Sequence, residues 1–549
     1  MLKSIIQSAL GNEKADLVIK NGKIVDVLNH RIVEGNVAIK NGIIIGIGDY
    51  EGVEETDVKG AYVVPGFVDS HVHIESAMVT PAQYAKAVMP KGITTIIADP
   101  HEIANVKGEK GLVFMIEDGK RTPLEIHFML PSCVPATPFD HAGCVIDGDK
   151  TIELLEKYDF LGLGEMMNYP GVIGCIPDVL KKLESAEYID GHSPMIKGKD
   201  LNAYACGGIR NDHECSNANE ALEKISNGFD IFVREGTGAK NLEELMKAVN
   251  PYNLRHFAFC TDDKHPAEIL REGTISHCID KAIKLGYDPI DVYTMACYNS
   301  CVSYNLGRKG AVASGFEADI VVTRDINATH IERVYKKGVL VAENGKALFD
   351  TEGADISAVE NTVNIDTVKA DDLFLEFDSK KMVIALNEGS LITDGVYCES
   401  VEGLSLCANI ERHNTTGNIG KSYVKGLDIA NGAIAQTIGH DSHNISVIGS
   451  DSENMAVAVN ALGKQGGIVV VKDNKILAKM ELKVGGIMSD KNINDVVFEH
   501  EKIVEAAKTL SPSGSNETLM ILGFISLLVI PHYKLGDKGV FNVDEFKYV

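Results

Sequence analysis

Between residues 63 and 317 short apolar runs alternate with amphipathic stretches, a pattern that few architectures accommodate. Eight apolar runs occur, in the order VVPGFVDSHVH, ITTIIADPHE, EIHFMLPSC, FLGLGE, YIDGH, IRNDHE, DIFVREG and HFAFCTDD. Several are separated by amphipathic segments such as NANEALEKISNG, with Asn or Thr near the start and Gly near the end, as helix caps require. Repeated strand and helix units form a parallel sheet, and eight of them in about 255 residues predict a (β/α)8 TIM-like barrel.

The segments that flank this predicted barrel have the alternation of β-strands. Residues 1–62 read as short strands, with strong hairpin signals at Asn21-Gly22 and Asn41-Gly42. A similar texture returns at about 318–360, so we expect the two segments to complete one small β domain. From 365 to 549, apolar alternation with more Gly predicts a separate C-terminal α/β domain. The predicted fold class is therefore α/β, with a barrel over 63–317, a composite β domain and a C-terminal domain.

Charge and composition exclude several classes of partner. The net charge of −25 disfavours nucleic acid and anionic membrane surfaces. The longest apolar run near the C-terminus, Leu519–Ile530, is shorter than the ~20 residues that a membrane span needs. The first ten residues lack the features of a secretory signal, and the 11 Cys form no CxxC pair. We therefore expect a cytoplasmic protein with reduced thiols that acts on a small molecule.

Polar side chains recur where the predicted barrel strands end. His71 and His73 are two positions apart on one strand, so both leave the same face and can bind one ion. Alone, this pair is explained better as two hydrogen-bonded histidines at a strand end than as metal ligands. Four further candidates end other predicted strands: Glu165, His192, His213 and Asp262. Because active sites of barrel enzymes lie at this rim, we interpret the six residues as one metal site.

Imidazoles and carboxylates together suit Zn, Mn or Fe, with geometry and supply choosing among them. Two adjacent ions fit this number of ligands, and Glu165 is placed to bridge them. Some related sites bridge two metals with a carbamylated Lys, but no Lys occurs at the end of this strand.

A family resemblance is carried by VVPGFVDSHVHIES, TTIIADPHEIAN, GLGEMMNYPGV, DGHSP, RNDHEC, FCTDD and GAVASGFEADIVV. These motifs resemble the metal-dependent amidohydrolase superfamily, and specifically its adenine deaminase branch. PGFVDSHVH alone indicates only the superfamily, whereas DPHEIAN, GEMMNYPGV and NDHEC are much narrower. The resemblance extends over essentially the whole chain and includes IGHDSHN in the C-terminal domain.

The resemblance implies hydrolytic deamination of adenine to hypoxanthine and ammonia, as in purine salvage. It implies a centre of two divalent ions, with Mn or Fe expected before Zn, that activates water, and we expect a homo-oligomer. Carried over residue by residue, the implied metal ligands are His71, His73, Glu165, His192, His213 and Asp262.

Catalytic and substrate roles follow from the same resemblance and from position. Asp262 is expected to act as ligand and proton shuttle, with Glu165 as the bridging carboxylate and Glu102 as a proton donor to a ring nitrogen. A helix-start cap explains Glu102 equally well, an internal ion pair competes at Glu235, and a tight turn competes for the segment containing His440 and His443. The predicted substrate contacts are His101, Asp263, Glu235, His440 and His443.

The sequence leaves two other functions as alternatives. A hydrolase of cyclic amides, such as a dihydropyrimidinase or dihydroorotase, needs a carbamylated Lys where this chain has Glu165. A barrel that has lost catalysis and serves as a binding subunit typically loses metal ligands, and all six are present here.

Overall fold

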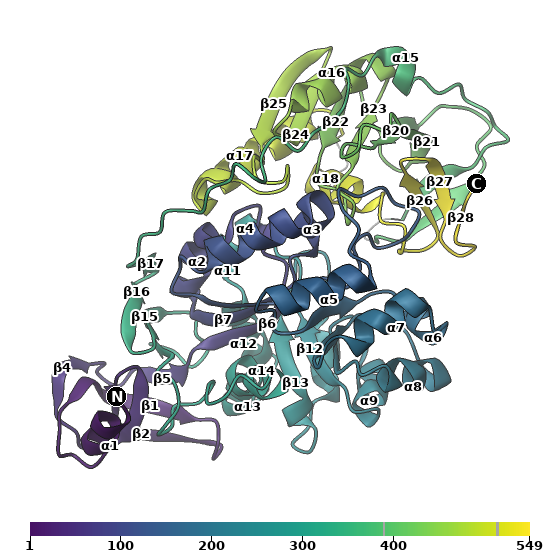
Figure 1. Cartoon of the computed structure of the whole chain (residues 1–549). Helices are drawn as coiled ribbons and strands as arrows, with labels where there is room; N and C mark the ends of the chain where they lie inside the picture. The colour runs from purple at the N-terminus through teal and green to yellow at the C-terminus, as the bar shows by residue number, and fades with distance from the viewer. Residues whose placement is uncertain (388–389, 512–514) are drawn as a thin grey trace.

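The computed structural model of this protein describes residues 1–387, 390–511 and 515–549. In Figure 1 the barrel occupies the centre, the N-terminal strands lie at its lower left and the C-terminal domain lies above it. The two chain ends lie on opposite sides of the molecule. Among the described residues, no helix combines the length and the hydropathy that a bilayer crossing requires.

Eight parallel strands form the barrel; seven lie within one of the eight apolar runs, and β9 extends one residue beyond its run, to Met166. They are β6 (Phe67–Val72), β7 (Ile93–Ala98), β8 (Glu125–Phe128), β9 (Leu163–Met166), β10 (Ile189–Gly191), β11 (Asn211–Asp212), β12 (Asp230–Arg234) and β13 (Phe257–Cys260). Three groups, β6–β8, β9–β10 and β11–β13, form regular parallel ladders. Single bridges join Leu130 to Leu163 and Val72 to Asp262, and Arg210 N donates to Ile189 O at 3.2 Å. These links close the ring and confirm the predicted barrel.

Helices cover the outside of the barrel, so its strands are buried on both faces, as the apolar runs require. Asn217 caps α9 by accepting from Glu220 N at 3.0 Å, in line with the predicted cap. The helices of this region are α2 (Pro81–Val88), α3 (His101–Lys107), α4 (Glu109–Gly119), α5 (Gly148–Lys157), α6 (Tyr169–Ile173), α7 (Pro177–Glu184), α8 (Gly198–Cys206), α9 (Ala218–Ser226), α10 (Leu242–Leu245), α11 (Pro266–Glu272), α12 (Ile275–Lys284), α13 (Pro289–Tyr293) and α14 (Asn299–Ser303).

One sheet unites strands from both sides of the barrel sequence. Its order is β17-β16-β15-β14-β5-β1-β2-β3, with β4 paired to β1, and the antiparallel pair β14 and β5 joins the two segments. The strands are β1 (Ala15–Asp26), β2 (Arg31–Lys40), β3 (Ile43–Ile47), β4 (Gly52–Asp57), β5 (Tyr62–Pro65), β14 (Ile320–Thr323), β15 (Ile331–Lys336), β16 (Val339–Glu343) and β17 (Lys346–Ala347), preceded by α1 (Leu2–Ala9).

Of the two predicted hairpin turns, only Asn41-Gly42 connects two strands, β2 and β3. Asn21-Gly22 instead lies inside β1, where the pairing register shifts between Ile19 and Gly22. Asn21 has a φ of 58°, so the residue pair forms a bulge that bends β1 rather than a turn that ends it. The turn prediction at Asn21-Gly22 was therefore wrong.

The C-terminal domain is built on an eight-stranded sheet of order β19-β18-β21-β20-β23-β22-β24-β25. Its helices α16 and α17 pack against this sheet, on β22 to β24 and on β24 and β25 respectively. The elements are β18 (Val383–Leu386), β19 (Thr393–Val396), β20 (Leu404–Ile410), β21 (Ile419–Lys425), β22 (Gly432–Gln436), β23 (Ile445–Gly449), β24 (Gly467–Lys472), β25 (Lys475–Glu481), α15 (Ala370–Leu373), α16 (Ser452–Leu462), α17 (Ile493–Lys508) and α18 (Ser515–Phe524). A small sheet follows, formed by β26 (Tyr533–Gly536), β27 (Gly539–Asn542) and β28 (Lys547–Tyr548).

A buried ammonium group on α9 supports the strand ends. Lys224 is 0% exposed and donates to Asp212 Oδ2 at 3.1 Å, Glu220 Oε1 at 3.0 Å and Ser193 O at 2.7 Å. Lys224→Met should lower the free energy of unfolding by about 3–5 kcal/mol, because two buried carboxylates lose their counter-charge. Urea unfolding followed by circular dichroism measures the change.

Lys284→Met is the matched control, because Lys284 is exposed and, among the described residues, pairs with Asp280 alone, at 2.7 Å. An exposed pair of this kind is worth less than about 1 kcal/mol. Equal effects of the two substitutions would show that burial does not strengthen the contribution of Lys224.

Candidate metal centre

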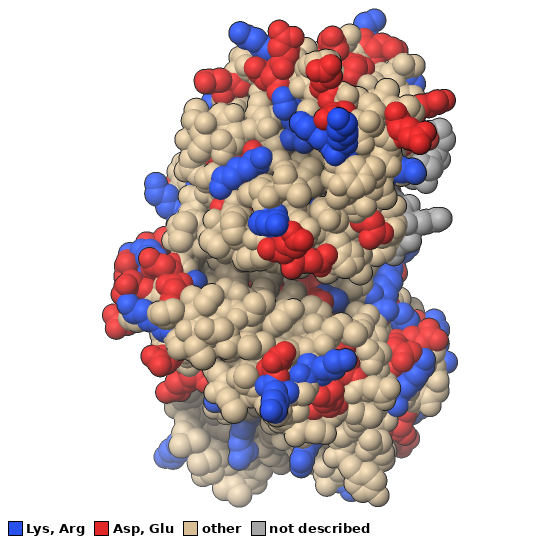
Figure 2. Space-filling view, turned by 90° about the vertical axis from the view of Figure 1, so that its right-hand side faces the viewer, with Lys and Arg blue, Asp and Glu red and all other residues tan. Residues whose placement is uncertain are grey.

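A cavity of about 420 Å³ opens where the barrel strands end and the C-terminal domain covers them. Barrel residues and residues 438–443 and 520–531 of the C-terminal domain line it together. On the face shown in Figure 2, acidic and basic side chains are mixed and the surface is hollowed between the upper part of the molecule and the barrel below. The candidate site therefore lies between two parts of the chain.

The two histidines of the first barrel strand converge, as their spacing predicts. The Nε2 atoms of His71 and His73 are 3.2 Å apart, and both rings are buried. Two nitrogens held about 2.0–2.1 Å from one ion at a near-tetrahedral angle have about this separation. His73 Nδ1 lies 2.8 Å from Asp99 O, so the Nδ1–H donates to this carbonyl and leaves Nε2 free for an ion.

Glu165, at the end of β9, contacts both sides of the cluster. Its Oε1 lies 3.2 Å from His73 Nε2, whereas its Oε2 lies 2.5 Å from His192 Nδ1 and 3.2 Å from His213 Nε2. Each oxygen thus faces a different group of imidazoles. The carboxylate therefore lies within reach of both groups of imidazoles.

Asp262 follows β13 and completes the cluster. Its Oδ1 is 3.2 Å from His73 Nε2 and 3.5 Å from His71 Nε2, and Arg234 Nη1 donates to Oδ2 at 2.9 Å. A φ of 57° turns the backbone at Asp262 into the left-handed region, an unusual conformation for a non-glycine residue. Burial would raise the pKa of Asp262, but hydrogen bonds from His71 and His73 and the charge of Arg234 hold it well below its usual range.

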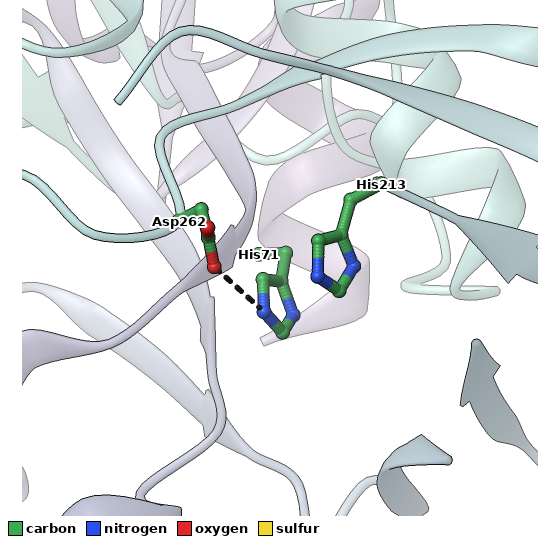
Figure 3. A group of neighbouring side chains, drawn as sticks. All are labelled: His71, His213 and Asp262. Atoms are coloured by element: carbon green, nitrogen blue, oxygen red, sulfur yellow. Dashed lines mark ion pairs between the residues drawn. The ribbon is translucent and has the colours of Figure 1, made fainter. Parts of the chain in front are cut away.

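Buried ring nitrogens of the cluster have no hydrogen-bond partner among the described residues, as expected for atoms that bind a divalent ion. His213 Nε2 lies near Glu165 Oε2, yet neither nitrogen of His213 makes a hydrogen bond within the described residues. Figure 3 shows His71 between Asp262 and His213, and the His71 and His213 rings stack with centroids 4.0 Å apart. Because buried polar groups are costly without partners, these residues suit a divalent cation of the borderline type.

Charge within the cluster supports the same interpretation. Burial and the neighbouring His213 lower the pKa of His71 to about 3, so the ring is neutral, the form that binds metals. Burial opposes ionisation of Glu165, but the charge of His192 and contacts with His101 and His213 hold the pKa of Glu165 well below its usual range. Burial would lower the pKa of His73 and of His192, but Asp262 and Glu165 raise the pKa of His73, and Glu214 and Glu165 raise the pKa of His192 to about 9. The ionised carboxylates thus favour positive charge within the cluster, as they would favour a bound cation.

The Asp99 carboxylate positions Glu165 by lying close to the backbone of residues 164 and 165. Asp99 Oδ2 accepts from Glu165 N at 3.0 Å, and a Cβ at Gly164 would lie 2.1 Å from the same oxygen. Gly164→Ala should therefore displace Glu165 and weaken metal binding by about 10- to 100-fold, the usual cost of losing support around a ligand. Titration of metal-free protein against a fluorescent chelator measures the affinity.

The control for this substitution is Gly353→Ala, whose Cβ would meet no atom closer than 3.4 Å. Unchanged metal affinity in both variants would mean that the contact between Asp99 and residue 165 does not set the ligand geometry.

The C-terminal domain reaches the barrel rim at Glu102, the second residue of α3. His440 Nδ1 forms an ion pair with Glu102 Oε1, and His443 Nε2 bonds Glu102 Oε2. Gly439 N donates to His443 Nδ1 at 3.1 Å, so the ring proton of His443 is on Nε2 and is donated to Glu102. Burial would raise the pKa of Glu102, but the charges of His440, His443 and His101 hold it well below its usual range.

The remaining predicted contacts divide into two groups. His101 and Asp263 line the cavity, with His101 Nδ1 3.2 Å from Glu165 Oε1 and Asp263 bonded by Ser76 Oγ. Glu235 does not line it, and this corrects the prediction of a substrate contact. Side chains alternate along a strand, so Glu235 points away from its neighbour Arg234. There Glu235 Oε1 accepts a hydrogen bond from Lys281 Nζ at 2.6 Å.

Among the cavity residues that were not predicted as site residues are Glu75, Ser76 and Glu214. Glu75 and Ser76 follow the first two histidines, and Glu214 follows His213. Glu214 binds the guanidinium of Arg234 and so fixes the group that holds Asp262. In the sequence, the sign that these residues belong to the site was their position shortly after predicted metal ligands.

Comparison with known proteins follows the same division of the chain. A family model described as the amidohydrolase family matches residues 62–368, and one described as the adenine deaminase C-terminal domain matches residues 380–547. The adenine deaminase of Clostridium acetobutylicum is 43% identical, with 99% of both chains covered. That of Petrotoga mobilis is 42% identical over 100% of this chain and 99% of its own. That of Halalkalibacterium halodurans is 41% identical over 98% and 96%.

A closed barrel with a cluster of imidazoles and carboxylates at its rim defines a metal-dependent amidohydrolase. Within that class, the chain belongs to the adenine deaminase family. The resemblance carried by the sequence motifs and the predicted fold class are both confirmed.

Proposed function

We propose that this chain hydrolyses adenine to hypoxanthine and ammonia. Family membership over the full chain supports the reaction, and the convergence of the six predicted ligands on one rim is the observation that carries it. Neither alternative gains support, since no carbamylated Lys is needed where Glu165 stands and no ligand has been lost.

Residues His71, His73, Glu165, His192, His213 and Asp262 would hold the divalent metal. A bound divalent metal supplies activation of water near neutral pH. We propose two ions, Mn or Fe before Zn, because each carboxylate oxygen of Glu165 faces its own group of imidazoles.

Asp262 takes the proton of the attacking water. Arg234 keeps this carboxylate ionised and oriented, so Asp262 can accept a proton as the water oxygen bonds to C6 of adenine. The proton then passes to the amino nitrogen as the bond from C6 to that nitrogen breaks, and ammonia leaves. Asp262 thus moves one proton from nucleophile to leaving group.

Glu102 is the candidate contact for a ring nitrogen. Its carboxylate lies between His101 and the two histidines of the C-terminal domain, and all of these residues line the cavity. His440 is a ready proton source, because the charge of Glu102 outweighs burial and raises the pKa of His440 to about 9. Glu102 and His440 together would supply the proton that a ring nitrogen gains during attack at C6.

Ammonia release from adenine, adenosine and cytosine by metal-loaded protein tests the substrate. We expect ammonia release from adenine and no ring opening of hydantoin or dihydroorotate. Ring opening without ammonia release would instead favour the cyclic-amide reaction.

Three further proposals concern the oligomeric state, the location and the metabolic role of this enzyme. We propose a homo-oligomer located in the cytoplasm and serving purine salvage, in line with the acidic composition and the proposed reaction. Light scattering after gel filtration measures the assembly, and growth on adenine as sole purine tests the salvage role.

A further inference from the structure

A second cavity, of about 870 Å³, shares no lining residue with the cavity of the metal centre. It is bounded by the junction of α3 and α4, by residues 354–364 and by His413 of the C-terminal domain. Three cations line it, together with two aromatic side chains: Lys107, Lys110, Arg121, Phe114 and Tyr158. Nothing in the proposed deamination reaction uses this space.

The cations of this cavity are unpaired. Within the described part of the chain, the side chains of Lys107, Lys110 and Arg121 make no ion pair or hydrogen bond. Burial lowers the pKa of Lys107, and the positive charges of Lys110 and Arg412 lower it further. The ammonium of Lys107 therefore lies in a positive electrostatic environment, although the chain carries a net charge of −25.

Two of the three acidic residues of the same cavity are paired with lysines. Glu109 accepts from Lys150 Nζ at 2.8 Å and from Lys157 Nζ at 2.6 Å. Glu117 accepts from Lys120 Nζ at 2.9 Å. Asp355, the third acid, accepts from Ser357 N at 3.0 Å and from Ser357 Oγ at 2.8 Å and has no cationic partner among the described residues. The three cations of the cavity outnumber this one carboxylate, so an excess of positive charge remains.

A buried guanidinium adds to this excess. Arg412 is 0% exposed and donates only to uncharged oxygens, among them Thr362 Oγ1 at 2.8 Å and Gly485 O at 2.9 Å. The carboxylate of the adjacent Glu411 instead accepts bonds from its own loop, including Thr416 Oγ1 at 2.9 Å. Thr362 lines the cavity, so Arg412 lies directly behind its wall.

We propose that this cavity binds a nucleotide, with the phosphate at Lys107, Lys110 and Arg121 and the planar base against Phe114 and Tyr158. Unpaired cations favour an anion, and aromatic side chains favour a flat ring. A volume of about 870 Å³ falls within the range of small-molecule sites. The site is separate from the metal centre, so its ligand and adenine can be bound together.

A thiol in the cavity wall allows the test on unmodified protein. Cys144 is partly exposed and lines the cavity, whereas Cys206 is exposed on α8, outside it. Adenosine 5′-monophosphate, added with saturating hypoxanthine to occupy the metal centre, should slow alkylation of Cys144 at least fivefold and leave Cys206 unchanged. Mass spectrometry of the two peptides measures both rates.

Ribose 5-phosphate and inorganic phosphate serve as separate arms of the same experiment. Protection that follows adenosine monophosphate first and inorganic phosphate last supports a nucleotide site. Equal protection by all three overturns the assignment of the base, and no protection at millimolar ligand overturns the site.

Variants then assign the contact. Lys107→Glu should weaken binding about 10- to 100-fold in calorimetry, the order of one hydrogen bond to a charged group. Lys199→Glu, an exposed residue of α8 outside the cavity, should bind as the unmodified protein does. If Lys107→Glu does not fold, Arg121→Glu at the exposed rim replaces it, and unchanged affinity in the folded variant contradicts the proposal.

Discussion

Asp262→Asn should lower kcat for adenine by about 10²–10⁴-fold, the usual contribution of general acid–base catalysis. The amide retains an oxygen that can bind an ion and can accept from Arg234, but it cannot take the proton of water. The loss should therefore appear in kcat while the metal content stays close to that of the unmodified protein. Steady-state ammonia release, paired with metal analysis of each preparation, separates the two effects.

Asp149→Asn is the control, because Asp149 lies on the exposed surface of α5 and pairs only with Lys181. Its kcat should be unchanged. An Asp262→Asn protein that is fully loaded with metal and keeps kcat within threefold would remove Asp262 from the proton pathway.

Glu102→Gln should have the second-largest effect, a loss of about 10²-fold or more in kcat/KM. The carboxylate holds two histidines from a domain 341 residues further along the chain, and an amide cannot replace its charge. The raised pKa of His440, now about 9, should also fall once that charge is gone. The alkaline limb of the pH profile should therefore move to lower pH.

A double-mutant cycle separates this interaction from general damage to the site. His443→Asn removes the ring that donates to Glu102, and the double variant should be little worse than either single one. Strictly additive losses would show that the two residues act independently. Glu505→Gln, an exposed acid on α17 outside both cavities, should leave kcat/KM unchanged.

Much of the metal centre could be predicted from sequence because the carboxyl ends of parallel barrel strands meet at one rim. His71, His73, Glu165, His192, His213 and Asp262 end strands that apolar runs alone could locate, and the structure brings all six together. Their assigned roles stay predictions until the variants are measured.

The contacts that failed or were missed depend on tertiary structure. Whether Glu235 faces the cavity depends on which face of β12 it leaves, and that in turn depends on where the strand ends. Its partner Lys281 comes from α12, whose register against β12 is not encoded locally. Similarly, no local signal shows that His440 and His443 contact Glu102, since domain packing makes that pair.

Asn21-Gly22 illustrates a third kind of error. The dipeptide favours a turn because both residues tolerate positive φ, and Asn21 does have this conformation. The pairing of β1 with β2 continues on both sides of it, so the same local preference produces a bulge. Only the neighbouring strand decides between the two outcomes.

The most direct measurement returns Mn²⁺ in increasing equivalents to metal-free protein and records ammonia release from adenine. We expect activity that rises with bound metal, levels near two ions per chain and is absent in His71→Ala at every loading. Ammonia release by the metal-free protein, or its absence from the fully loaded one, would contradict the assignment of these six side chains to a metal-dependent deamination site.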